Sequence, residues 1–224
     1  MGARGVVGTV LVLGVLVGGA VVADGVARDR TEERLASELR RQIPGLDTEP
    51  DVAIGGVPFL TQLIGGELDT VRVTAPSAVL EGLPLHDVDV HLAGVSTDQP
   101  TTAREATMSA LARTEDLSEV LDLGADLRVE GEHLVTSFEV LTATVDVVLA
   151  PAAAGREIAV DVVELRALGG SVDPDDVPGL GGRFDALTVP VDQLPEGLEL
   201  TRLTVVEEGV RIEAEGSDVV LPTQ

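Results

Sequence analysis

From residue 52 onward, apolar and polar side chains alternate along most of the chain, which is the pattern of strands that bury only one face. In the segment 69–75, for example, Val71 and Val73 share one face. The same alternation predicts strands over 52–54, 86–92 and 157–165 and three strands within 127–149, with a turn at 130–133. It also predicts a hairpin of strands 198–206 and 210–214 around residues 207–209. Residues 103–114 also alternate, and although alanine-rich segments form helices too, we assign a strand there.

A helical period appears before these strands. Leu35, Ala36 and Leu39 lie on one stripe of a helix expected over residues 29–43, and Pro44 follows its end. Such a stripe normally packs on a sheet.

Two shorter features interrupt the strands. The glycines and the proline of the segment 55–58 predict a bulge or a strand edge, and a turn of helix is expected at residues 60–64. A second short helix is expected over 114–123. The predicted fold class is α+β, a curved, mostly antiparallel β-sheet wrapped around the long N-terminal helix. No linker divides residues 24–224, which are expected to form one domain.

The segment before this domain contains an uncharged run. Residues 5–23 hold nineteen residues without a charge, and as a helix they would be roughly 28 Å long, close to the thickness of a bilayer core. Residues 1–23 are therefore expected to be a transmembrane anchor or a signal segment. The run is longer than a usual signal peptide, which favours an uncleaved anchor with residues 24–224 exported to the cell envelope, on the periplasmic side.

Composition excludes several classes of function. The chain has 15 cationic residues, all of them arginine, against 39 acidic ones, so its net charge is -24. Without cysteine or lysine it has no thiol nucleophile, disulfide or Schiff base. Three phenylalanines are its only aromatic residues, and such an acidic chain is not expected to bind nucleic acid. The same charge repels anionic leaflets, so membrane attachment would depend on the N-terminal helix.

No motif predicts catalysis. Asp87, Asp89 and His91 would share one face of a strand and suggest a metal cluster, but a closed site needs a fourth ligand and acidic residues line solvent faces throughout this chain. We therefore expect no metal, no cofactor and no enzymatic activity. A hydrolase that uses carboxylates stays a third alternative, without a positioned nucleophile or base.

Two sequence segments resemble a known family. The segment Gly55-Gly56-Val57-Pro58-Phe59-Leu60, together with Leu194-Pro195-Glu196-Gly197-Leu198-Glu199-Leu200, resembles the LmeA-like phospholipid-binding family of actinobacterial cell-envelope proteins over residues 30–221. The resemblance implies an exported or membrane-anchored protein that binds phospholipids of the phosphatidylinositol type. It also implies a role in the synthesis or transport of mannosylated envelope lipids, and a fold similar to half of a tubular lipid-binding (TULIP or BPI-like) domain. The family has no catalytic residues to carry over.

The predicted function is thus that of an envelope phospholipid-binding protein that holds acyl chains in an aliphatic groove. The predicted lining comprises Leu35, Leu39, Ile43, Val57, Phe59, Leu60, Leu63, Ile64, Phe138 and Phe184, although residues of this kind more often form an ordinary core. Arg72 is a candidate for meeting a phosphate. The alternative is a membrane-tethered acidic scaffold or adaptor with a packed interior, whose protein partner the sequence does not identify.

Overall fold

The computed structural model describes most of the chain from residue 23 onward. The described residues are 23–41, 46, 48–80, 82–120, 125–140, 143–167, 170–172, 187–192 and 194–221. The predicted anchor, up to residue 22, and the predicted lining residues Ile43 and Phe184 lie outside them. Within the described part, no helix is both long enough and apolar enough to cross a membrane.

Six strands form the first sheet, which we call sheet A. Its strands are β1 (Asp51–Gly55), β2 (Glu67–Leu80), β3 (Leu83–Ser96), β4 (Thr102–Arg113), β11 (Glu196–Val206) and β12 (Gly209–Val220). They pair antiparallel in the order β1-β2-β3-β4-β12-β11. The strand assignment over 103–114 is therefore correct, as is the hairpin around residues 207–209.

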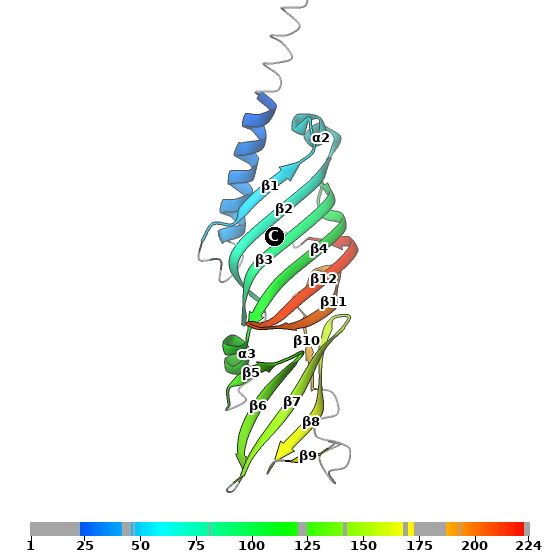
Figure 1. Cartoon of the computed structure of the whole chain (residues 1–224). Helices are drawn as coiled ribbons and strands as arrows, with labels where there is room; N and C mark the ends of the chain where they lie inside the picture. The colour runs from blue at the N-terminus through cyan, green and yellow to red at the C-terminus, as the bar shows by residue number, and fades with distance from the viewer. Residues whose placement is uncertain are drawn as a thin grey trace, which may run out of the picture.

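The second sheet, sheet B, lies beyond the end of sheet A (Figure 1). Its strands are β5 (Leu127–Glu130), β6 (His133–Val140), β7 (Ala143–Ala154), β8 (Glu157–Ala167), β9 (Gly170–Val172) and β10 (Leu187–Pro190). They pair antiparallel in the order β10-β8-β7-β6-β5, and β9 also pairs with β8. The α+β class with mostly antiparallel strands is confirmed, but two sheets replace the single sheet predicted. The sequence pattern predicts neither β10 nor β9, which lies in a segment rich in glycine, proline and aspartate that is expected to be a loop over 169–183.

The two sheets meet where the β7–β8 turn approaches β11. The backbone N–H of Leu200 donates a hydrogen bond to the carbonyl of Gly155 at 2.6 Å. Next to it, the Arg156 guanidinium donates to four carbonyl oxygens of the segment before and within β11. These belong to Leu194 (2.6 Å), Pro195 (3.0 Å), Leu198 (3.2 Å) and Asp192 (3.3 Å). One guanidinium thus binds four backbone carbonyls, three of them in the segment before β11, and links the β7–β8 turn of sheet B to sheet A.

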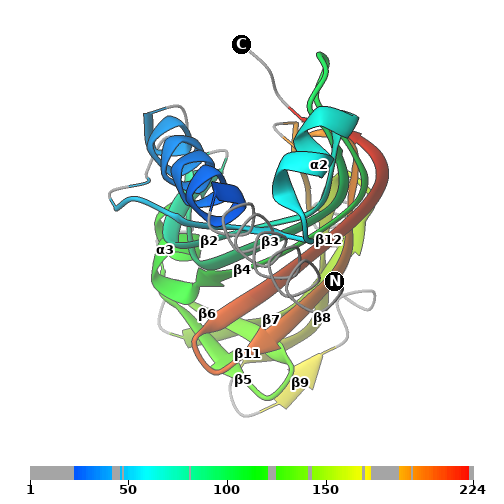
Figure 2. The same ribbon diagram turned by 90° about the horizontal axis from the view of Figure 1, so that it is seen from above.

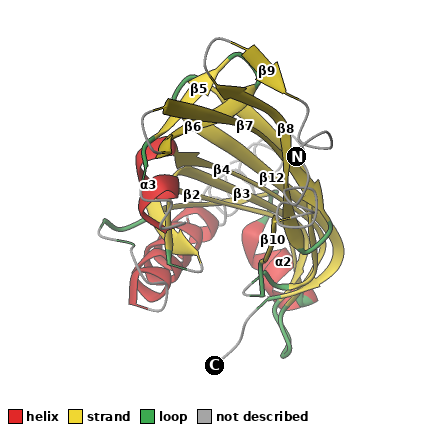
Figure 3. Ribbon diagram, turned by 90° about the horizontal axis from the view of Figure 1, so that it is seen from below, coloured by secondary structure: helices red, strands yellow, loops and turns green. Residues whose placement is uncertain are grey.

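The helices lie on the open side of the curved strands (Figures 2 and 3). The N-terminal helix is described over residues 23–41, so the predicted helix over 29–43 also extends toward the N-terminus. Through Ala36 and Leu39 it packs against Val52 and Ile54 of β1 and Val71 of β2. The helix therefore covers one end of sheet A and not sheet B, which differs from a sheet wrapped around it.

Two short helices complete the fold. Helix α2 (Phe59–Gly65) follows β1 and confirms the turn of helix predicted at residues 60–64, and β1 itself is an edge strand of sheet A, as the glycines and the proline of 55–58 predict. It ends at Gly66, whose φ of 81° lies in the left-handed region that favours glycine. Helix α3 (Thr114–Val120) follows β4 and confirms the predicted helix there, with residues 121–123 outside the described part.

Candidate apolar binding cavity

An apolar cavity of about 140 Å³ lies between the two sheets, below the junction that Arg156 closes. Sixteen residues line it, and every one is apolar: Leu80, Leu83, Ala112, Leu117, Val120, Leu127, Leu134, Leu149, Pro151, Ile158, Val160, Val191, Leu200, Leu203, Val210 and Ile212. Within the part of the chain that the structure describes, the lining offers no charge, hydroxyl or amide side chain to a ligand. Its chemistry therefore suits hydrocarbon.

Strand registers bring this lining together. Leu134 of β6 stands directly opposite Leu149 of β7, and Pro151 of β7 stands opposite Val160 of β8. These cross-strand pairs project from one face of sheet B. Ile212, two residues along β12 from Val210, contributes the facing wall from sheet A. The cavity therefore joins residues more than 100 positions apart in the chain.

Partly exposed residues mark the mouth of the cavity. Val120, at the end of α3, is 44% exposed although it lines the cavity, and Leu117 and the hairpin residues Leu80 and Leu83 are half-buried. Helix α3 itself has no fully buried residue. The mouth thus opens beside a small helix that makes few contacts with the core.

The volume limits what fits without movement. A cavity of about 150 Å³ in a protein core takes a molecule of benzene size, whereas pockets for larger ligands measure roughly 300–1,000 Å³. At about 140 Å³, the cavity between the sheets holds only part of an acyl chain. A whole chain requires α3 or the sheets to move apart.

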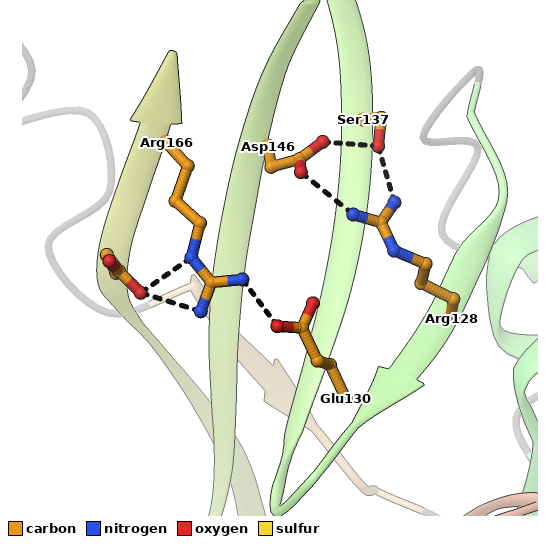
Figure 4. A network of polar contacts seen from close by, with 6 residues as sticks. Arg128, Glu130, Ser137, Asp146 and Arg166 are labelled. Carbon is orange, nitrogen blue, oxygen red and sulfur yellow. Dashed lines mark hydrogen bonds and ion pairs between the residues drawn. The ribbon is translucent and has the colours of Figure 1, made fainter. Parts of the chain in front are cut away.

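The polar clusters lie away from the cavity. On the opposite face of sheet B, Ser137 donates a hydrogen bond to Asp146 at 2.6 Å, and Arg128 bridges both residues (Figure 4). The Ser137 hydroxyl, followed by Arg128, holds the pKa of Asp146 below its usual value. A second ion-pair cluster on the same face joins Arg166 to Glu130 and to Glu164, and Arg166 lowers the pKa of Glu164. Asp146 and Glu164 therefore stay ionised at neutral pH, unlike a general acid.

Asp89 and His91 of β3, two of the three residues considered as metal ligands, make other contacts. Asp89 accepts two hydrogen bonds from Arg72, at 2.5 and 3.1 Å, and His91 lies 3.5 Å from the same carboxylate. The Arg72 hydrogen bond lowers the pKa of Asp89. Among the described residues no three potential ligands come together as a metal site. Arg72, the candidate for a phosphate contact, is engaged with Asp89 on the sheet surface.

The described members of the predicted lining are not among the residues that line this cavity. Phe59 is completely buried in a separate core with Ala36, against which Leu39 also packs. Phe138 packs against the main core beside the cavity without lining it. The remaining described members of the predicted lining, Leu35, Val57, Leu60, Leu63 and Ile64, are exposed. Their contact with lipid stays a prediction. The observed cavity is lined mostly by residues of the strands. The alternation in the sequence predicts these strands, but it does not predict which of them pair.

A carboxylate connects α2 to the N-terminal helix. Asp24 Oδ1 accepts a hydrogen bond from the backbone N–H of Leu60 at 2.7 Å, and Oδ2 accepts one from Phe59 at 2.9 Å. Arg28, one helical turn further, donates to the carbonyl of Gly56 at 2.7 Å and lies 3.7 Å from Asp24. The Leu60 and Phe59 amides hold the pKa of Asp24 below its usual value.

This arrangement predicts acid-sensitive attachment of α2. A carboxyl whose pKa is depressed on folding stabilises the protein above the unfolded value of about 3.9, and the contribution is lost as the pH falls through the folded pKa. The Tm of the wild type should exceed that of Asp24→Asn by a steady margin from about pH 7 to about pH 5, and the margin should shrink below about pH 4. Thermal melts across this range check it, and a margin that stays constant into strong acid would contradict it.

One comparison with known proteins gives a match. The model of a family described as LmeA-like phospholipid-binding matches residues 22–215, which include every strand of both sheets except the last residues of β12. No curated protein and no solved structure matches the chain significantly.

Proposed function

The chain belongs to the LmeA-like phospholipid-binding family, and from this premise we propose that it holds the acyl chains of a phospholipid between its two sheets. The observation that carries the proposal is the cavity lined by sixteen apolar residues. A phospholipid-binding protein needs an apolar site for the tails, and this cavity supplies one.

Burial of methylene groups supplies the affinity. Each methylene removed from water contributes roughly 0.8 kcal/mol, so even the part of a chain that enters about 140 Å³ adds appreciable binding free energy. The half-buried Leu80, Leu83 and Leu117 at the mouth extend this apolar surface. We propose that the acyl chain enters past α3 and that the headgroup stays outside, in water.

We also propose that the protein is anchored in the cell membrane and works in the envelope. Residues 1–23 anchor the chain in the cell membrane, and the domain from residue 24 is exported to the envelope. There it supports the synthesis or transport of mannosylated lipids built on phosphatidylinositol. The two curved sheets, with helices on their open side, support a fold similar to half of a TULIP domain (Figure 2). The acidic surface favours a lipid held by its tails and not by an anionic headgroup.

Native mass spectrometry of the full chain, released from mild detergent, tests the binding. We expect a protein peak that carries one phospholipid, and extraction of that complex should identify the lipid. Protein without lipid, which also fails to exchange labelled phospholipid with liposomes, would overturn the proposal. That result would leave the tethered acidic adaptor as the better account.

A further inference from the structure

The outward face of α2 is apolar, where a helix surface that faces water is normally polar. Leu60, Leu63 and Ile64 share this face at spacings of three and four residues, and Val57 lies just before the helix. Ile64 is 87% exposed and Val57 is 78% exposed, whereas Phe59 on the inward side is fully buried. We call Val57, Leu60, Leu63 and Ile64 the α2 tip. A cluster of exposed aliphatic side chains of this kind marks an interaction surface.

The α2 tip is also free of charge in a strongly acidic chain. The sequence from Val52 to Gly66 contains no charged residue, although the whole chain has a net charge of -24. The polar Gln62 turns inward, where its side chain bonds to the Gly55 carbonyl and to the Asp69 amide. The hydroxyl of Thr61 is the one exposed polar side-chain group within the described helix α2, so the surface around the tip is uncharged and mostly hydrocarbon, which matches the interface of an apolar medium better than a charged partner.

The tip lies beside the point where the apolar N-terminal run meets the domain. The uncharged run covers residues 5–23, and Asp24, the next residue, binds the first two amides of α2. Figure 1 places α2 and the start of the N-terminal helix at the same end of the molecule. A bilayer that holds the run therefore comes within reach of the tip.

We propose that the α2 tip inserts into the interfacial region of the bilayer that holds the N-terminal segment. The inference rests on the proposed membrane anchor and adds a second attachment beside it. Two attachments fix the orientation of the domain, with sheet B pointing away from the membrane. Leu92 and Leu221 pack against both the core under α2, which contains Phe59, and the core around the cavity, so the two cores are joined through apolar side chains.

Fluorescence of single labels on the full chain tests the insertion. The chain has no cysteine, so Ile64→Cys carries one environment-sensitive dye on the tip, and Glu132→Cys carries the same dye on an exposed turn of sheet B as the matched control. Both proteins are placed in nanodiscs of neutral phosphatidylcholine, with one chain per disc. Spin labels on the acyl chains quench dyes in the bilayer, and aqueous iodide quenches dyes in water.

We expect the Ile64 dye to be blue-shifted and quenched several-fold more by the spin-labelled lipid than the Glu132 dye, with the opposite order for iodide. Because the tip has no charge, added salt should not change this result. Iodide quenching of both dyes to the same extent would overturn the inference, as would protection that appears only with two chains per disc, which would indicate a second copy on the tip. Failure of the chain to enter discs would overturn the anchor as well. Lipid in the cavity, measured by native mass spectrometry, is independent of all these outcomes.

Discussion

Replacing Phe59 with alanine should lower the free energy of unfolding by about 3–5 kcal/mol, the usual cost of truncating a buried phenylalanine. Phe59 has no exposed surface, and it packs α2 against Ile54, Leu68 and Val71 of the first two strands. The lost ring leaves a cavity under α2 that the sheet, held by its hydrogen bonds, fills only in part.

Ile64→Ala is the matched control for this experiment, because Ile64 lies on the same helix and is 87% exposed. Its free energy of unfolding should stay within about 0.5 kcal/mol of the wild-type value. Denaturant titrations of the full chain in detergent, followed by circular dichroism, measure both variants. A small loss for Phe59→Ala would show that Phe59 is not part of the core and would favour the sequence-based assignment of this residue to a lipid groove.

Replacing Val160 with phenylalanine should weaken phospholipid binding on the order of a hundredfold. Val160 lines the cavity from β8, opposite Pro151, and the ring adds four carbons to a space of about 140 Å³. If these carbons displace about four methylene groups of the ligand at roughly 0.8 kcal/mol each, about 3 kcal/mol of binding free energy is lost.

Val163→Phe makes the same change on the same strand, but Val163 is exposed and does not line the cavity. It should retain lipid at the wild-type level. Titration with a fluorescent phospholipid gives the affinities, and melts confirm that both variants are folded. Equal affinities of the two variants would contradict an acyl site between the sheets.

The local structure of this chain follows from its sequence to a large extent. Alternation correctly predicts the long strands, and the assignment of residues 103–114 to a strand is confirmed by β4. The turn at residues 131–132 and the hairpin at 207–208 are also where the pattern places them. Each of these features is determined by residues that are close together in the sequence. The alternation of apolar and polar residues is therefore sufficient to predict them.

The long-range arrangement does not follow from the same pattern. Whether β12 pairs with β4, or whether the strands divide into two sheets, depends on contacts between residues about 100 positions apart. The predicted lining comes mainly from the helical stripe and the segment around α2, where Phe59 is buried in a core and Ile64 is exposed, whereas other residues line the cavity between the sheets. The family resemblance was the part of the functional prediction that is confirmed, since it needs no knowledge of pairing.

Photo-crosslinking from the acyl chain measures most directly where the lipid lies. The full chain is loaded with a phospholipid that carries a diazirine near the end of one tail, irradiated, and cleaved after arginine. Cleavage places β6 and β7 in the peptide 129–156, most of β8 in 157–166, and α2 in 42–72.

We predict that the label appears in 129–156 and 157–166 and that excess unlabelled phospholipid removes it. A label confined to 42–72, or one that unlabelled phospholipid does not displace, would contradict an acyl site between the two sheets.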